Sequence, residues 1–288
     1  MLDIDAVLEK IKYRKTRWTR KQRTEGTLRM YRSIFRRYNA LPMPENATEL
    51  DRVKKFIESL KGGNTARTAY FALKSAFTVQ GWPWFPEDAD PLPPLPEEVE
   101  RPFYTKEEID AIFNEARRDN PRDYLLVRIT FLSGARRIQV VKIRKQDYDP
   151  RRGVLQIAAA KNTPAGEWLL DPVTREVLEL YLKNHKWYYL FPSRNGKGHL
   201  SPDTLTEVWR KYCERAGIVY RQEGMKHGKG AHGARRGRVT YLHKIGYDLD
   251  DITKALRWKG PQTVMTYIRT LPSEVMEDIQ KHDPYYMQ

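Results

Sequence analysis

The chain has 288 residues and a formal net charge of +15, with 52 Lys and Arg residues against 37 Asp and Glu residues. Hydrophobic residues make up 40% and aromatic residues 11%, which excludes an intrinsically disordered protein and gives enough length for two modest domains. The single cysteine, Cys213, excludes an intramolecular disulfide and a cysteine-based zinc site. The positive surplus favours a polyanionic partner, with nucleic acid ahead of an anionic membrane.

The chain shows no run of about 18 apolar residues and no signal-like N-terminus, since it begins MLDIDAVLEK. We therefore expect no membrane partner. The low cysteine content agrees with a reducing compartment, so we expect a cytoplasmic protein that associates with DNA.

The first part of the chain predicts a small helical bundle, because apolar residues recur there at three- and four-residue steps. Three such sets are present: Leu28, Tyr31, Ile34, Phe35 and Tyr38; Leu50, Val53, Phe56, Ile57 and Leu60; and Ala66, Ala69, Tyr70, Leu73 and Phe77. The stretch KIKYRKTRWTRKQR, residues 10–23, is densely basic and holds two aromatic residues. It is either a solvated face or a contact to DNA phosphates, and the total charge favours the second.

The segment FPEDADPLPPLPEEVERPF, residues 85–103, is rich in proline and acid. Proline at this density is incompatible with a helix or a central strand, so we predict a semi-extended linker. The predicted organisation is a helical domain at residues 1–86, a linker at 87–102 and a second domain at 103–288.

The second domain opens with a capping-box pattern, Thr105 three residues before Glu108, which predicts a helix start. Residues 123–149 predict an apolar helix, a Ser-Gly turn and a second helix, and residues 153–172 predict a β-hairpin. Further helices are predicted around residues 173–184, 202–216, 232–245 and 249–258. The expected fold is therefore mainly α with a small antiparallel β-sheet.

Five short motifs follow one another in this second domain. They are SGAR with Arg136, KNTPAGEW with Lys161, HGAR with His232 and Arg235, LRW with Trp258 and, nine residues later, VMTYIR with Tyr267. In this order and spacing they resemble the catalytic domain of the tyrosine recombinases, the family of phage integrases, Xer and Cre. The resemblance covers residues 103–270, and the predicted N-terminal bundle with its linker is similar in layout to the family's core-binding domain.

The resemblance implies a set of roles in breaking a DNA phosphodiester without metal or cofactor. Arg136 and Arg235 stabilise charge on the phosphate oxygens, since a guanidinium matches phosphate and stays charged. His232 is the candidate base for the nucleophile Tyr267, whose hydroxyl has a pKa near 10 when unperturbed. Lys161 is the candidate acid that protonates the leaving 5′ oxygen. Trp258 is expected to pack over the phosphate and to donate its indole N–H.

Several of these assignments have alternatives in the sequence. Lys161 has the weakest motif, and it is either a plain turn lysine or the acid, with Lys142, Lys145 and Lys186 as nearby candidates. Trp258 also fits a simple core position. Tyr285 and Tyr286 are rival tyrosines without the helix and spacing context.

Three positions depart from the family's usual pattern. Gln139 stands where an acidic residue is typical, Arg257 where glycine is typical, and Arg236 where histidine is common. The substitution at Gln139 puts full activity in question and favours a catalytically silent DNA-binding protein of the same fold as one alternative.

The resemblance implies a site-specific, integrase-like recombinase that cleaves and rejoins double-stranded DNA through a 3′-phosphotyrosyl intermediate and a Holliday junction. It also implies a homotetramer on two DNA sites. The tail, residues 271–288, has a short amphipathic pattern and either packs on its own domain or docks on a neighbouring protomer. A type IB topoisomerase is a further alternative, because it shares this active-site logic.

Overall fold

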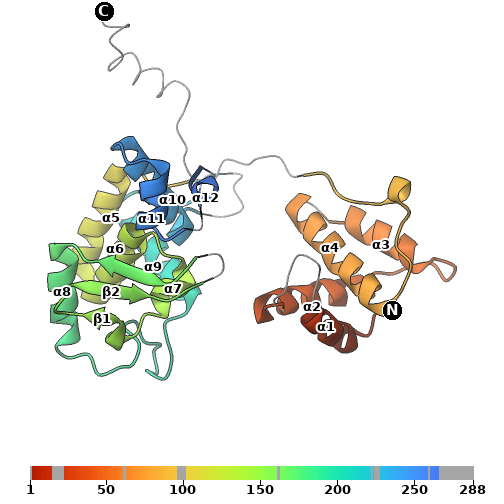
Figure 1. Cartoon of the computed structure of the whole chain (residues 1–288), viewed down its shortest axis with the longest axis horizontal. Helices are drawn as coiled ribbons and strands as arrows, with labels where there is room; N and C mark the ends of the chain where they lie inside the picture. Colours follow the sequence, from red (N-terminus) through yellow and green to blue (C-terminus); the bar gives the residue numbers. More distant parts are fainter. Residues whose placement is uncertain are drawn as a thin grey trace, which may run out of the picture. The chain divides into compact units, whose positions relative to one another are not determined.

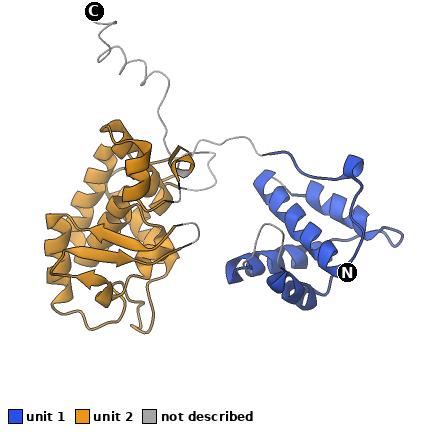
Figure 2. Cartoon of the chain, viewed as in Figure 1, with its two compact units in different colours: residues 1–99 blue, residues 100–288 orange. Residues whose placement is uncertain are grey.

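The computed structural model describes residues 2–14, 23–60, 63–95, 102–160, 163–221, 223, 228–258 and 260–265. The chain divides into two compact units, residues 1–99 and residues 100–288, which are coloured separately in Figure 2. Each unit has a hydrophobic core of its own. The predicted fold class, mainly helical with a small antiparallel sheet, is confirmed.

Unit 1 is a bundle of helices whose apolar faces meet in one core. Its helices are α1 (Ile4–Tyr13), α2 (Glu25–Asn39), α3 (Glu49–Glu58) and α4 (Gly63–Gln80). The three predicted apolar sets lie on α2, α3 and α4, and most of their members are buried. α1 is an addition to the prediction, although Ile4, Val7, Leu8 and Ile11 have the spacing of one helical face.

The start of the expected linker is anchored to unit 1. A 3₁₀ turn, Glu87–Ala89, leads to Asp90, whose carboxylate accepts hydrogen bonds from the side chains of Tyr70, Lys74 and Trp84. Three donors on one carboxylate hold the backbone in place against α4. The first residues of the predicted linker thus contact unit 1, and the linker bounds 87–102 stay a prediction.

Unit 2 is built around α6 (Pro121–Ser133), which is buried along most of its length. It packs against α5 (Lys106–Asp119), α8 (Pro172–Leu182), α9 (Pro202–Arg215) and α10 (Gly230–Lys244). Thr105 and Glu108 form the predicted capping box at the start of α5. The helix predicted after the Ser-Gly turn is short, α7 (Arg137–Val141), and a 3₁₀ turn at Lys145–Asp147 follows it.

The sheet has three antiparallel strands in the order β1-β2-β3 (Figure 1). They are β1 (Tyr148–Asp149), which was not predicted, and the predicted hairpin strands β2 (Val154–Ile157) and β3 (Gly166–Leu169). Leu155 pairs with Trp168 and Ile157 with Gly166. Beyond the strands, Ala160 and Thr163 exchange two backbone hydrogen bonds and so extend the hairpin.

The last predicted helix, residues 249–258, is shorter than expected: α11 is Leu249–Ala255, and α12 (Pro261–Met265) comes after it. The backbone N–H groups of Arg257 and Trp258 bond back to the carbonyls of Lys254 and Thr253. Arg257 itself has φ +56°. This is a Schellman motif, in which a left-handed residue ends the helix.

No helix in the described parts of the chain is both long and apolar enough to cross a membrane.

Candidate active site

Arg136 lies in the tight turn between α6 and α7. Gly134 ends α6 with φ +58°, and Arg136 is the N-cap residue of α7. A Cβ on Gly134 would lie 2.8 Å from Cδ2 of Leu256, so the turn requires glycine for its backbone angle and for its packing. Arg136 is partly buried, and its Nη1 has no hydrogen-bond partner among the described residues.

His232 and Arg235 lie in the first two turns of α10, three residues apart and therefore on one face. Gly233 and Gly237 bring this helix into backbone contact with the segment before α5: a Cβ on Gly237 would lie 2.4 Å from the carbonyl oxygen of Tyr104. Glycine at these two positions sets how close α10 comes to α5. The close approach of α10 determines the positions of His232 and Arg235, which lie on the same helix.

Arg235 is held between two other motifs. Its Nη1 donates to the carbonyl of Gly134, and its guanidinium lies over the ring of Trp258, 4.1 Å from the ring centroid. Arg235 is 1% exposed and Trp258 is 5% exposed. A cation stacked on an indole face in a site shielded from water is strongly held. Trp258 thus contacts an expected phosphate ligand directly, which makes it more than a distant core residue.

Residues next to Trp258 complete the contact with the Arg136 turn. Leu256 packs on Gly134, and Nη2 of Arg257 donates to the carbonyl of Ser133 at 3.3 Å. Three motifs therefore meet around the end of α6: SGAR, HGAR and LRW. The first and the last of them are more than a hundred residues apart in the sequence.

The pKa of His232 is lowered from 6.5 to about 4. The largest cause is the loss of water around the ring, and the positive charges of Arg236, Arg137, Arg235 and Arg136 add to it. The side chain nevertheless keeps an exposed edge. His232 is therefore neutral at physiological pH and accessible, so a ring nitrogen can accept a proton, and an anionic phosphate bound beside it would raise its pKa toward the range of an effective base.

The same neighbours reveal cations that the sequence reasoning did not place in the site. Arg137 donates to Asp203 and Thr206 on α9, and Arg236 donates to the carbonyl of Pro102. The second arginine of each pair in SGARR and HGARR is the sequence feature that could have indicated Arg137 and Arg236.

Two of the predicted site residues, Lys161 and Tyr267, lie outside the described residues. So do the rival tyrosines Tyr285 and Tyr286 and the tail at residues 271–288. Of the alternative lysines, Lys145 donates to the carbonyl of His185, and Lys186 lies 5.3 Å from the ring centroid of Trp187. Lys142 is exposed after α7.

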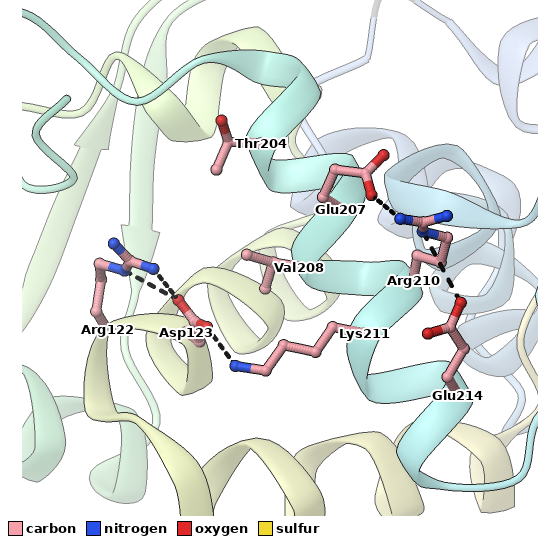
Figure 3. Close-up of a pocket in the computed structure, with 8 residues that line it drawn as sticks. All are labelled: Arg122, Asp123, Thr204, Glu207, Val208, Arg210, Lys211 and Glu214. Carbon is pink, nitrogen blue, oxygen red and sulfur yellow. Dashed lines mark hydrogen bonds and ion pairs between the residues drawn. The ribbon is translucent and has the colours of Figure 1, made fainter. Parts of the chain in front are cut away.

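A separate pocket of about 340 Å³ lies between α6 and α9 (Figure 3). Its charged side chains are already paired: Asp123 with Arg122 and Lys211, and Arg210 with Glu207 and Glu214. None of the predicted site residues lines it, so this hollow is not the place where the motifs meet. Within the described ranges, no group of three His, Cys, Asp or Glu side chains is arranged to hold a metal ion.

The model of the phage integrase family matches residues 102–274. The chain belongs to the phage integrase family, the tyrosine recombinases. The tyrosine recombinase XerA of Pyrococcus horikoshii is 24% identical over 271 residues, which cover 90% of this chain and 88% of that protein. A probable integrase/recombinase protein of Methanocaldococcus jannaschii is 27% identical over 186 residues, 60% of this chain and 53% of that protein.

Solved structures of tyrosine recombinases share the fold. The Tn1549 transposon integrase in complex with circular intermediate DNA gives a TM-score of 0.68 at 12% identity, covering 98% of this chain and 99% of that one. The XerH recombinase bound to its difH substrate gives 0.67 at 16% identity, covering 88% and 77%. The predicted family and the predicted enzyme class, a tyrosine site-specific recombinase, are confirmed.

Proposed function

We propose that this tyrosine recombinase cleaves and rejoins duplex DNA with Tyr267 as the nucleophile. The observation that carries the proposal is the meeting of Arg136, His232 and Arg235 at the end of α6, with Trp258 against Arg235. A neutral imidazole beside two guanidinium groups, one of them held in place by its partners, matches what phosphodiester cleavage requires.

In the proposed step the Tyr267 hydroxyl oxygen bonds to phosphorus, and its proton passes to the neutral ring of His232. The bond from phosphorus to the 5′ oxygen breaks, and Lys161 gives that oxygen a proton. The products are a 3′-phosphotyrosyl link and a free 5′ hydroxyl. Because the enzyme keeps the phosphate in a covalent ester, a second 5′ hydroxyl can attack and restore the DNA backbone without ATP.

Arg136 and Arg235, both proposed to stabilise the phosphate, differ in burial and in hydrogen-bond partners. Nη1 of Arg136 is buried and has no hydrogen-bond partner among the described residues, while the residue as a whole is partly exposed. Arg235 is buried, held by the Gly134 carbonyl and the Trp258 ring. We infer that Arg136 contacts the phosphate directly, and that Arg235 acts from a fixed, poorly hydrated position where its charge is felt most strongly.

Double-stranded DNA is the proposed partner, and unit 1 is the proposed core-binding domain. The net charge of +15 supports this assignment, as does the basic stretch that begins at the end of α1. Strand exchange through a Holliday junction by four copies on two DNA sites is the arrangement we propose, with the protein associated with DNA inside the cell. The tail, residues 271–288, is proposed to dock on a neighbouring protomer; unimpaired pairing of two DNA sites after its deletion would refute that assignment.

The proposal is tested by covalent trapping on a library of nicked random duplexes, with the native protein and Tyr267→Phe side by side. DNA that stays on the protein after denaturation is sequenced. We expect an adduct with the native protein only, through a 3′ phosphate, and a sequence common to the trapped DNA.

Two other outcomes point to the alternatives. Tight binding with no adduct from either protein would identify a catalytically silent DNA-binding protein. Adducts that lead to relaxation of supercoiled DNA without any strand exchange would identify a type IB topoisomerase.

A further inference from the structure

Two of the positions that depart from the family's usual pattern, Gln139 and Arg257, contact the same β-hairpin. Gln139 lies on α7, three residues after Arg136, and Arg257 follows α11. Both side chains are buried, at 3% and 8% exposure. They reach opposite strands of the hairpin formed by β2 and β3.

Gln139 bridges the Arg136 turn and the end of β2. Its Oε1 accepts the backbone N–H of Arg136 at 3.1 Å, and its Nε2 donates to the carbonyl of Ala158 at 2.6 Å. One partner is a donor and the other is an acceptor, so the neutral amide satisfies both without having to take up a proton. An ionised carboxylate at this position would accept from Arg136 but would face the Ala158 carbonyl with a second acceptor.

Arg257 bridges the end of α6 and β3. Its Nη1 donates to the carbonyl of Glu167 at 3.2 Å and its Nη2 to the carbonyl of Ser133 at 3.3 Å. The stem of the side chain packs on Gly166, where a Cβ would lie 2.7 Å from Cδ of Arg257. Glycine would suit the backbone of Arg257 better, because residue 257 has φ +56° in the Schellman motif.

The left-handed backbone of Arg257 therefore has a compensating interaction. Burial lowers the pKa of Arg257 to about 10, so the group stays charged at neutral pH. Its charge is met by carbonyl dipoles, and no ion pair to it is formed among the described residues. A buried cation is retained only where such hydrogen bonds offset its lost hydration.

We propose that Gln139 and Arg257 are positioning residues that tie the two strands of this hairpin to the segment 133–139, which carries Arg136. The importance of this tie for catalysis rests on the proposed function, in which Lys161 on the same hairpin protonates the leaving oxygen. It follows that the residues typical of the family, glutamate at 139 and glycine at 257, loosen the hairpin in this protein.

The first test measures the hairpin without any reaction. Hydrogen exchange of the full-length protein is compared for the native chain, Gln139→Glu, Arg257→Gly and the double variant. Matched controls are Gln156→Ala and Arg152→Ala, because both side chains donate hydrogen bonds to the exposed carboxylate of Glu167 on the hairpin itself and, among the described residues, to no atom of the segment 133–139. We expect exchange of the Ala160 and Thr163 amides to rise about 3- to 10-fold in each single variant, the factor that corresponds to one lost hydrogen bond, and not in the controls.

The second test asks whether the tie serves proton donation. Single-turnover cleavage is measured on DNA with the normal 5′ oxygen and on DNA with sulfur at that bridging position. A thiolate leaves without a proton because a thiol has a pKa of about 8.5. We expect Gln139→Glu and Arg257→Gly to cleave the oxygen substrate about 10- to 100-fold more slowly, part of what a placed acid contributes, and to regain near-native rates with sulfur.

The outcomes separate this proposal from the proposed function. Unchanged hairpin exchange in both variants would overturn the positioning role, and so would an equal loss of rate on the two substrates. Absence of any native adduct would refute the proposed function, yet the exchange measurement would still decide whether Gln139 and Arg257 hold the hairpin. Lys161→Ala is the positive control, and rescue of its cleavage by the sulfur substrate is the result expected if this lysine is the proton donor.

Discussion

Replacement of Gly134 by alanine is expected to damage both the stability and the active site of the enzyme. Gly134 has φ +58°, and a Cβ there would lie 2.8 Å from Cδ2 of Leu256. The backbone angle alone costs roughly 1–2 kcal/mol for a residue with a Cβ. The contact adds about 1–3 kcal/mol, since well-packed cores resist an extra methyl group.

Gly217 offers a matched control. It has φ +67° and nothing within 4 Å of its ideal Cβ, so Gly217→Ala meets only the backbone term. For a unit of this size, roughly 2–4 °C of melting temperature correspond to 1 kcal/mol. We expect a fall of about 4–20 °C for Gly134→Ala and about 2–8 °C for Gly217→Ala, both measured by calorimetry.

The carbonyl of Gly134 also holds Arg235, and the same turn carries Arg136. Cleavage by Gly134→Ala should therefore fall by at least about 10-fold below the melting range, because a small misplacement of catalytic groups is costly, and Gly217→Ala should cleave normally. In a double-mutant cycle, Leu256→Ala should relieve part of the loss. Equal melting temperatures for the two alanine variants, or strict additivity with Leu256→Ala, would refute the packing argument.

Three further predictions concern the charges of the site. The pKa of His232 is about 4 in the folded protein and 6.5 in the unfolded chain, so acidification from pH 6.5 toward 4 protonates the unfolded state first and should destabilise the fold. An NMR titration, with His232→Gln to assign the signal, should show a neutral ring at pH 5.5. A titration midpoint near 6.5 would contradict the electrostatics of the site. Trp258→Ala should destabilise unit 2 by about 3–5 kcal/mol, and Trp258→Phe by much less, because phenylalanine keeps a ring face for Arg235. Equal midpoints of denaturant unfolding for the two variants would argue against the stacking of Arg235 on Trp258. DNA affinity should fall by at least about 100-fold between 50 and 200 mM salt, and a flat salt profile would rule out binding through phosphates.

The sequence predicted the parts of this molecule that depend on local pattern. The capping box of Thr105 and Glu108, the hairpin and the helix that carries His232 and Arg235 all follow from spacing and residue type. The family and its motif order were also readable. These features are local, so a single stretch of chain contains the information.

Other features depend on partners that are distant in sequence. Nothing near Gln139 indicates that its amide reaches Ala158, and nothing near Arg257 indicates the carbonyl of Glu167. The end of α11 was misplaced because arginine is an unusual residue for the left-handed position of a Schellman motif. The hydrogen bonds that anchor Asp90 to α4 could not be predicted either, because its partners Tyr70 and Lys74 lie outside the proline-rich segment that contains it.

The central claim is that these motifs converge to serve Tyr267. Its most direct test is mass spectrometry of the peptide that keeps a nucleotide after the trapped adduct is digested with protease and nuclease. We predict one modified peptide, VMTYIR or a longer product containing it, with the nucleotide joined to Tyr267 through its 3′ phosphate. A nucleotide on Tyr285 or Tyr286, or a 5′ linkage, would contradict the account.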